Sequence, residues 1–522
     1  MTVEEIKRGS GFTKSEQKLA FLAERTFLNL WSYPNTYNDK KQNGKGDGKE
    51  LCDLLVVCGD DVIIFSDKSV EWPSHPDIDV AWGRWYRQAV KKSVDQIRGA
   101  QRWLKEFPDR VFLDPTCQKR LPIDLPPVER RRVHGVVVAV GASDACKRYH
   151  KDQSGTFIIH SHLKGAEHTQ KEHSYYLPFA IGDVDPDGPF VHVFDGTSVD
   201  LIMRELDTVS DFVRYLNRRE YVIRNQKVLM SAGEEDLLGY YLTHTGPDGE
   251  HDFIRPDGNA LGKNDALVID TGTFTELSRN PQYREKKKSD SISYVWDRLI
   301  ETFTEHILAG TSVSLFGETP TPSLAERGLR TMALENRLAR RMLGGGVSSG
   351  LLRAKEQKLD RFARVLFPGY TPKHVDRAYV LLVLAYPKFL DDDGGYEAYR
   401  RARVNFLRAY CLAAAQQHKN IKTIVGIGID AAPEVTGRAG GSEDLIAIDT
   451  STWDEELEQE ALEAREKLDV LSPDRIEAYR ASSTEYPDIG FAAVEGEKLS
   501  RQQRRARERA MRKAQRRTRG RS

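Results

Sequence analysis

The chain has 522 residues, of which 39% are apolar and 30% are charged. This length suggests two to four domains, and the composition is typical of a soluble globular protein and excludes a mainly disordered or fibrous one. Lysine plus arginine and aspartate plus glutamate both total 78, so the overall charge of zero says nothing about partners.

The cysteines and the apolar segments bear on the cell compartment. The five cysteines are scattered and form no C-x-x-C pair, which favours a reducing interior. The N-terminal sequence lacks the apolar core of a secretory signal, and no stretch approaches the ~20 apolar residues that span a bilayer. We therefore expect a cytoplasmic protein without a membrane partner, and the sequence leaves a homo-oligomer open.

The first part of the chain predicts a helix followed by a β-hairpin. Apolar residues recur at helical spacing over 13–33, where Thr13 and Glu16 have the spacing of a capping box. Two apolar runs, 51–57 and 62–66, are joined by glycine and aspartate residues that suit a tight turn.

Beyond residue 130 the pattern predicts further α/β units. In chain order these elements are strands at 133–140, 156–160 and 190–194, helices around 198–219 and 234–243, polar loops at 246–264 and 279–290, a helical region at 291–366 broken near glycines 344–346, a strand at 378–386, a helix at 396–418, strands at 421–429 and 444–449, and an acidic helix at 454–469. The expected fold class is therefore multidomain α/β.

The hairpin carries charges where a buried strand would not have them. Asp53 opens an otherwise apolar strand and Lys68 ends the next one. Because side chains alternate along a strand, Ser66 and Lys68 share a face while Asp67 points the other way. A carboxylate beside a lysine suits Mg²⁺ and an activated water, since the carboxylate binds the hard cation and the lysine orients the nucleophile or offsets phosphate charge.

In these residues the sequence resembles the PD-(D/E)xK nuclease superfamily, which has the restriction-endonuclease-like fold. The resemblance covers about residues 13–107, where a helix, an Asp-bearing strand, a Lys-bearing strand and a second helix follow in the order of that family's core. Asp53 matches the family aspartate and Lys68 its lysine. Glu24 matches the acidic residue that many members have on the first helix, and Gln96 a polar residue that some use on the second.

The resemblance implies a role for each matched residue. Asp53 and Glu24 would bind Mg²⁺ or Mn²⁺, Lys68 would position the attacking water, and Ser66 would occupy the place of the family's second acid. That serine is a departure from the motif. Either Glu24, Glu50 or Asp67 replaces the missing ligand, or the site has lost its activity.

A basic helix next to this hairpin suggests contacts with nucleic acid. The helix expected over 81–107 mixes cations with tryptophan and tyrosine, which suits phosphate contacts and base stacking. The cations expected to bind are Arg84, Arg87, Lys91 and Lys92, together with Gln96. In the alternative, the aromatic residues form core and the cations are only the wet face of an amphipathic helix.

The end of the chain is strongly basic. Residues 501–521 contain eleven lysines and arginines and one glutamate, a net of 11 − 1 = +10. As a basic arm, with Arg504 and Arg505 among its cations, this tail would bind nucleic acid without sequence preference. The alternative is a clasp on the acidic helix 454–469, whose net charge is 2 − 8 = −6.

These observations lead to one functional expectation and one alternative. The units expected are a PD-(D/E)xK-like domain at 1–125, a mixed α/β region at 126–245, a loop and helical region at 246–370, a C-terminal α/β unit at 371–453, an acidic helix and linker at 454–500 and a basic tail at 501–522. The expected function is metal-dependent hydrolysis of phosphodiester bonds in DNA, in restriction, repair or antiviral defence. The alternative is an inactive nuclease-like protein that acts as a nucleic-acid-binding or assembly module, which Ser66 favours.

Overall fold

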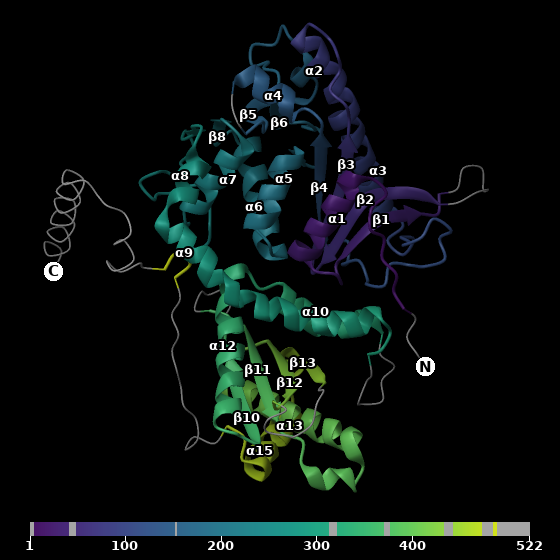
Figure 1. Cartoon of the computed structure of the whole chain (residues 1–522), viewed down its shortest axis with the longest axis vertical. Coiled ribbons are helices and arrows are strands. Elements are labelled where there is room, and N and C mark those ends of the chain that lie inside the picture. The colour runs from purple at the N-terminus through teal and green to yellow at the C-terminus, as the bar shows by residue number, and fades with distance from the viewer. Residues whose placement is uncertain are drawn as a thin grey trace, which may run out of the picture.

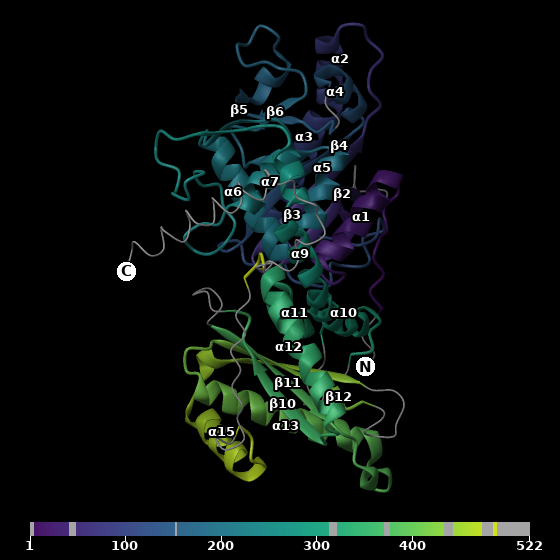
Figure 2. The same ribbon diagram turned by 60° about the vertical axis from the view of Figure 1, so that its left-hand side comes forward.

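The protein is a mixed α/β structure with three β-sheets, as a computed structural model of the whole chain shows (Figure 1). Figures 1 and 2 show two lobes, which we call the N-terminal lobe, with the first two sheets, and the C-terminal lobe, with the third. The residues described are 5–40, 48–151, 154–312, 321–369, 376–432, 442–471 and 484–487.

The first sheet has five strands in the order β1-β2-β3-β4-β7. The strands are β1 (Ser32–Asn38), β2 (Lys49–Cys58), β3 (Asp61–Ser69), β4 (Arg132–Val140) and β7 (Val191–Phe194). The first three are antiparallel neighbours, whereas β4 runs parallel to β3 and β7 parallel to β4. The sheet thus extends past residue 125, so the unit is larger than the expected 1–125.

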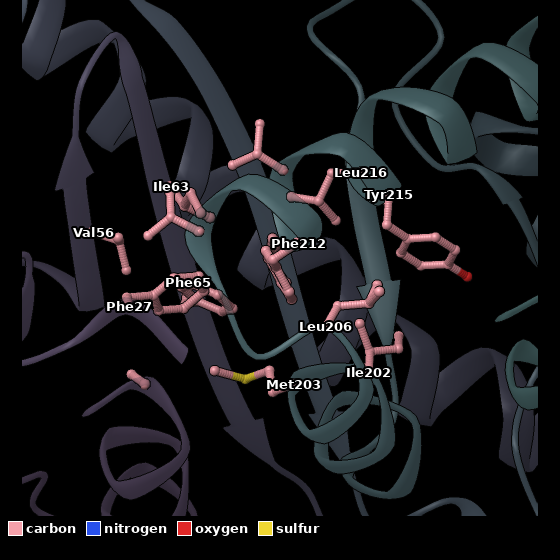
Figure 3. Close-up of a cluster of buried hydrophobic side chains, with 14 of the residues drawn as sticks. Phe27, Val56, Ile63, Phe65, Ile202, Met203, Leu206, Phe212, Tyr215 and Leu216 are labelled. Atoms are coloured by element: carbon pink, nitrogen blue, oxygen red, sulfur yellow. The ribbon is translucent and has the colours of Figure 1, made fainter. Parts of the chain in front are cut away.

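Helices cover both faces of this sheet. They are α1 (Lys14–Phe27), α2 (Ile78–Tyr86), a π-helical turn (Arg87–Lys91), α3 (Lys92–Glu106), α5 (Gly196–Glu205) and α6 (Val209–Arg224). On one face, the ring of Phe65 lies 6.0 Å from Phe27 of α1 and 6.2 Å from Phe212 of α6 (Figure 3). On the other face Gly135 of β4 leaves room for Ile97 of α3, since a Cβ there would lie 2.7 Å from that side chain.

The second sheet completes the N-terminal lobe. Its order is β6-β5-β8-β9. Its strands and the helices beside it are α4 (Ser143–His150), β5 (Ile158–Lys164), β6 (Ala180–Asp183), β8 (Val228–Ser231), α7 (Glu234–Thr243), β9 (Leu267–Ile269), α8 (Thr273–Arg279) and α9 (Pro281–Ser289).

The third sheet, in the order β10-β11-β12-β13, forms the C-terminal lobe. The elements from the lobe junction onwards are α10 (Tyr294–Leu308), α11 (Pro322–Ala333), α12 (Arg337–Glu356), β10 (Arg361–Leu366), β11 (Arg377–Leu384), α13 (Gly395–Gln417), β12 (Thr423–Asp430), β13 (Glu443–Asp449) and α15 (Glu455–Leu468). The expected strands, long helix and acidic helix of this unit are all present within a few residues.

Several local expectations were wrong, each for a physical reason. Residues 361–366, expected to be helical, form strand β10 because they pair antiparallel with β11. The first helix ends at Phe27 instead of continuing to 33, and the chain then forms β1, whose turn-forming residues are buried beside β2. Residues 281–289 form α9 instead of a loop, with Pro281 at the helix start. Helix α12 continues through Gly344 instead of breaking there. The glycine allows close packing, because a Cβ at this position would lie only 2.4 Å from the Ile292 carbonyl oxygen.

The structure also bears on the expectations about membrane-spanning segments and cysteines. In the part of the chain that the structure describes, no helix is long and apolar enough to cross a membrane. The five cysteines, all of which lie in the described part of the chain, form no disulfide.

Candidate functional site

The first sheet splits between β2 and β3. The two strands pair from Cys58–Asp61 up to Leu54–Phe65. Beyond that point, β2 pairs with β1 through Cys52 and its neighbours, and β3 continues beside β4. The first residues after the split are Asp53 on β2 and Ser66 on β3, so the expected motif lies where the two strands separate.

Asp53 occupies the split with a buried carboxylate. Its residue is 4% exposed, and its Oδ2 accepts a 2.6 Å hydrogen bond from the Asp67 backbone amide. Burial raises the pKa of Asp53 to about 7, although attraction to Lys68 and the Asp67 amide pull in the other direction. The carboxyl group is therefore poised between its neutral and ionised forms near neutral pH.

Ser66 and Lys68 lie on the same face of β3, the face that α3 covers. Ser66 donates a 3.0 Å hydrogen bond from Oγ to Oε1 of Gln96 on α3. Lys68 is half-buried and its charge acts on Asp53. The structure therefore brings four of the predicted residues, Asp53, Ser66, Lys68 and Gln96, to one side of the sheet.

Asp67 points to the opposite face, as strand alternation predicts. Both of its carboxylate oxygens accept from the Ser15 hydroxyl of α1, at 2.8 and 2.7 Å. Burial raises its pKa to about 6. Asp67 lines a pocket of about 410 Å³ with Lys14, Ser143 and Thr197, on the face of the sheet opposite to Ser66 and Lys68.

The first-helix acid near the site is Glu16. Its charge acts on both Asp53 and Asp67 and raises their pKa values. Asn35 of β1 links it to a second acid, because its Nδ2 donates to Glu16 Oε2 at 3.0 Å and to Glu50 Oε1 at 3.2 Å. Glu16 also accepts a 2.9 Å hydrogen bond from the Phe12 amide, as part of the helix cap. The sequence pattern indicated only this capping role, so the position of Glu16 near the site was not predicted.

The expected metal ligand Glu24 does not join the site, and this prediction is corrected. Glu24 lies eight residues after Glu16, which corresponds to about 12 Å along the axis of α1. It pairs with Arg8 at 3.5 Å and lines a different pocket, of about 510 Å³, with Tyr294 and Glu301 near α10. The two acids thus lie at opposite ends of one helix.

The acids at the split fit only one kind of magnesium site. Among the residues that the structure describes, no group of three or more histidine, cysteine, aspartate or glutamate side chains is arranged to hold a metal ion. A closed protein cage is therefore not formed by those residues. Mg²⁺ is more often held by one or two carboxylates, with water and substrate phosphates at its other positions. Asp53 suits such a site, because a nearby cation would favour the ionised form of a carboxyl group whose pKa is about 7.

The cations of the α2–α3 segment face solvent. Arg84, Arg87, Lys91 and Lys92 are exposed, and Lys92 lies one helical turn before Gln96. The aromatic residues of the segment are all buried: Trp82, Trp85, Tyr86 and Trp103. Base stacking on these rings was therefore a wrong expectation, whereas phosphate contacts by the cations stay a prediction. Arg504 and Arg505 lie outside the described residues.

Comparisons of the chain with protein-family models, with curated proteins and with solved structures found no match.

Proposed function

We propose that the protein hydrolyses phosphodiester bonds in DNA at the split between β2 and β3, in restriction, repair or defence. The observation that carries this proposal is the buried carboxyl group of Asp53, on which the charge of Lys68 acts. Both residues lie where strands β2 and β3 stop pairing, just beyond the Leu54–Phe65 pair. The element order around these residues supports the proposal, because helix α1, the antiparallel strands β2 and β3, and helix α3 follow one another in the order that the resemblance implies.

Each residue would have a distinct role in this reaction. Asp53 would be the protein ligand of Mg²⁺ or Mn²⁺, with the substrate phosphate completing the site, and Glu16 would add negative charge in place of Glu24. The bound ion would lower the pKa of water and offset phosphate charge. The Lys68 ammonium would donate to a phosphate oxygen or to the attacking water and fix its position. Ser66 and Gln96, joined by their hydrogen bond, would hold the wall of the site on the α3 side.

A second candidate function rests on Ser66. The family's second acid is replaced by this serine, and its hydroxyl is engaged by neutral Gln96 instead of facing the site with a charge. Together with the absence of a three-ligand group among the described residues, this favours a protein that binds nucleic acid on a nuclease-like fold without cleaving it.

Plasmid cleavage separates the two functions. Purified protein would be incubated with supercoiled DNA in Mg²⁺, in Mn²⁺ and in EDTA, beside the variant Asp53→Asn. If the protein is a nuclease, the wild-type protein should nick the plasmid in Mg²⁺ or Mn²⁺ but not in EDTA, and Asp53→Asn should not nick it under any of these conditions. A wild-type protein that binds the DNA but leaves it intact with both metals would support the second function instead.

Thermal unfolding gives a readout that does not depend on activity. Mg²⁺ should raise the melting temperature of the wild-type protein in the presence of a non-cleavable DNA, because a ligand that binds only the folded state stabilises it. The variant Asp53→Asn should lose this metal-dependent increase. An equal increase in both proteins would show that the ion binds elsewhere.

A further inference from the structure

A short segment from the end of the chain docks on the N-terminal lobe. Residues 484–487 have the sequence Thr-Glu-Tyr-Pro and follow α15 of the C-terminal lobe in the chain. Figures 1 and 2 show this yellow segment beside α9, far from α15. We call it the latch, and its surroundings the latch pocket.

The side chain of Glu485 is held by two cations. Its Oε2 lies 2.9 Å from Nε2 of His251, which is in the segment after α7, and its Oε1 lies 3.3 Å from Nζ of Lys286 on α9. These partners lower the pKa of Glu485 to about 2, against the effect of burial. A neutral side chain could not replace the carboxylate at both contacts, because charge-assisted hydrogen bonds are roughly twice as strong as neutral ones.

The backbone and the tyrosine of the latch are bound as well. Arg341 of α12 donates to the Thr484 carbonyl at 3.3 Å and to the Glu485 carbonyl at 3.1 Å. Tyr486 donates from its hydroxyl to the Leu242 carbonyl at 2.6 Å. The pocket therefore contacts a carboxylate, two carbonyls and a phenol on consecutive residues.

The charges that face the latch come from every element around it. Lys286 and Arg341 also bind Asp290, at 2.9 and 2.6 Å. Without the latch, Lys286, Arg341 and Asp290 carry 2 − 1 = +1. Docking adds the Glu485 carboxylate, which raises the pKa of His251 against burial and so favours its protonated form. The other acids whose charge acts on the latch or its partners are Glu205 near Tyr486, and Asp211, whose pKa Glu485 raises. An empty pocket would leave the two buried cations Lys286 and Arg341 sharing the single carboxylate of Asp290, so the pocket favours an anionic occupant.

We propose that the latch pocket is a docking site for an acidic residue followed by tyrosine, and that its occupant is Glu485-Tyr486 of the same chain, bound as an exchangeable ligand. The latch has no regular secondary structure and is held by side-chain contacts, so a free peptide can reproduce all of them.

Binding of a labelled peptide tests the proposal. The peptide has the sequence of residues 481–490, and the acceptor is the full chain with Glu485→Ala and Tyr486→Ala, whose own latch cannot compete. The peptide should bind this acceptor, and should bind the wild-type chain at least about tenfold more weakly, because a tethered latch has an effective concentration in the millimolar range. A peptide with Glu485→Gln should also bind at least about tenfold more weakly.

Matched substitutions on α9 locate the binding site. Lys286→Met in the acceptor should weaken peptide binding, whereas Lys288→Met, which changes a 76% exposed lysine on the same helix, should not. Where the double acceptor does not fold, the single variant Glu485→Gln replaces it. No peptide binding to either acceptor, or equal binding of the wild-type and Gln peptides, would overturn the proposal.

Discussion

The backbone amide of Asp67 donates a 2.6 Å hydrogen bond to the carboxylate of Asp53, and this bond joins β2 and β3 where their strand pairing has stopped. The carboxyl group is thereby fixed in the split, where burial raises its pKa to about 7. Lys68, which lies on the same face of β3 as Ser66, supplies a positive charge that acts on Asp53. Asp53 thus has a structural partner, the Asp67 amide, and a charged partner, Lys68, that can act in the reaction.

The pKa of Asp53 predicts how its removal affects stability. The carboxyl pKa is raised from 3.8 in the unfolded chain to about 7 in the folded one, so the acid makes the fold progressively less stable as pH rises from 3.8 to 7. Asp53→Asn keeps an oxygen that can accept from the Asp67 amide. It should therefore increase the free energy of unfolding, by up to about 4 kcal/mol at pH 8 and by less at pH 5.

Urea unfolding at the two pH values measures this effect. Asp109→Asn is the control, because that aspartate is exposed. An equal change in stability for Asp53→Asn at pH 5 and pH 8 would contradict the raised pKa.

Lys68 is expected to matter for cleavage far more than for folding. The side chain is half-buried near the end of β3, so Lys68→Ala leaves little cavity. If the ammonium positions the nucleophile, cleavage should fall by about 10²-fold or more while DNA binding stays nearly intact. Cleavage and binding would be measured on the same preparation, with Lys388→Ala in the C-terminal lobe as the control. Wild-type cleavage by Lys68→Ala would remove this residue from the mechanism.

The two glutamates of α1 give a direct comparison. Glu16→Gln should reduce cleavage, because the site would lose a negative charge that attracts the metal ion, whereas Glu24→Gln should not, because Glu24 pairs with Arg8 at the far end of the helix. The apparent pKa of Asp53 should also fall in Glu16→Gln, since a like charge has been removed. NMR titration of the Asp53 carboxyl group measures this shift. The opposite ranking of the two variants in the cleavage assay would restore the prediction made from the motif.

The exposed cations of α2–α3 should determine part of the salt dependence of DNA binding. If Arg84, Arg87, Lys91 and Lys92 each contact a phosphate, replacing all four by alanine should reduce the slope of log K against log[salt] by about 0.9 × 4, or roughly 3.6. Binding at three salt concentrations gives the slope. The control variant replaces four cations of the C-terminal lobe: Lys388, Arg401, Lys419 and Lys467. A slope equal to that of the wild-type protein would show that this segment does not contact DNA.

Docking of the latch should depend on pH. Glu485 has its pKa lowered to about 2, so its contribution is fully present above 4.5, its ordinary value, and is lost as pH falls toward 2. Glu485 raises the pKa of His251 above 6.5 against burial, so the histidine contributes fully below 6.5 and its contribution is lost as pH rises through the raised value. Peptide affinity should therefore be highest between about pH 4.5 and 6.5 and lower at pH 9. His251→Gln should remove the alkaline loss, and a peptide affinity independent of pH would contradict the role of this histidine.

The sequence by itself determined the features that depend on neighbouring residues. Alternation along the strand placed Ser66 and Lys68 on one face and Asp67 on the other, and this needs only the period of two of a β-strand. The apolar pattern likewise located α13 and β12, because each buries many of the apolar residues that form the pattern.

Tertiary structure alone decided which distant residues meet at the site. Glu16 and Glu24 are equally acidic and lie on one helix, and only the position at which α1 crosses the sheet puts the first near Asp53 and the second near Arg8. Strand β1 escaped prediction because its turn-forming residues become a strand only through pairing with β2. The latch could not be predicted at all, since the groups that bind Glu485 come from segments about 140 to 235 positions away in the chain, and no local pattern records a contact of that range.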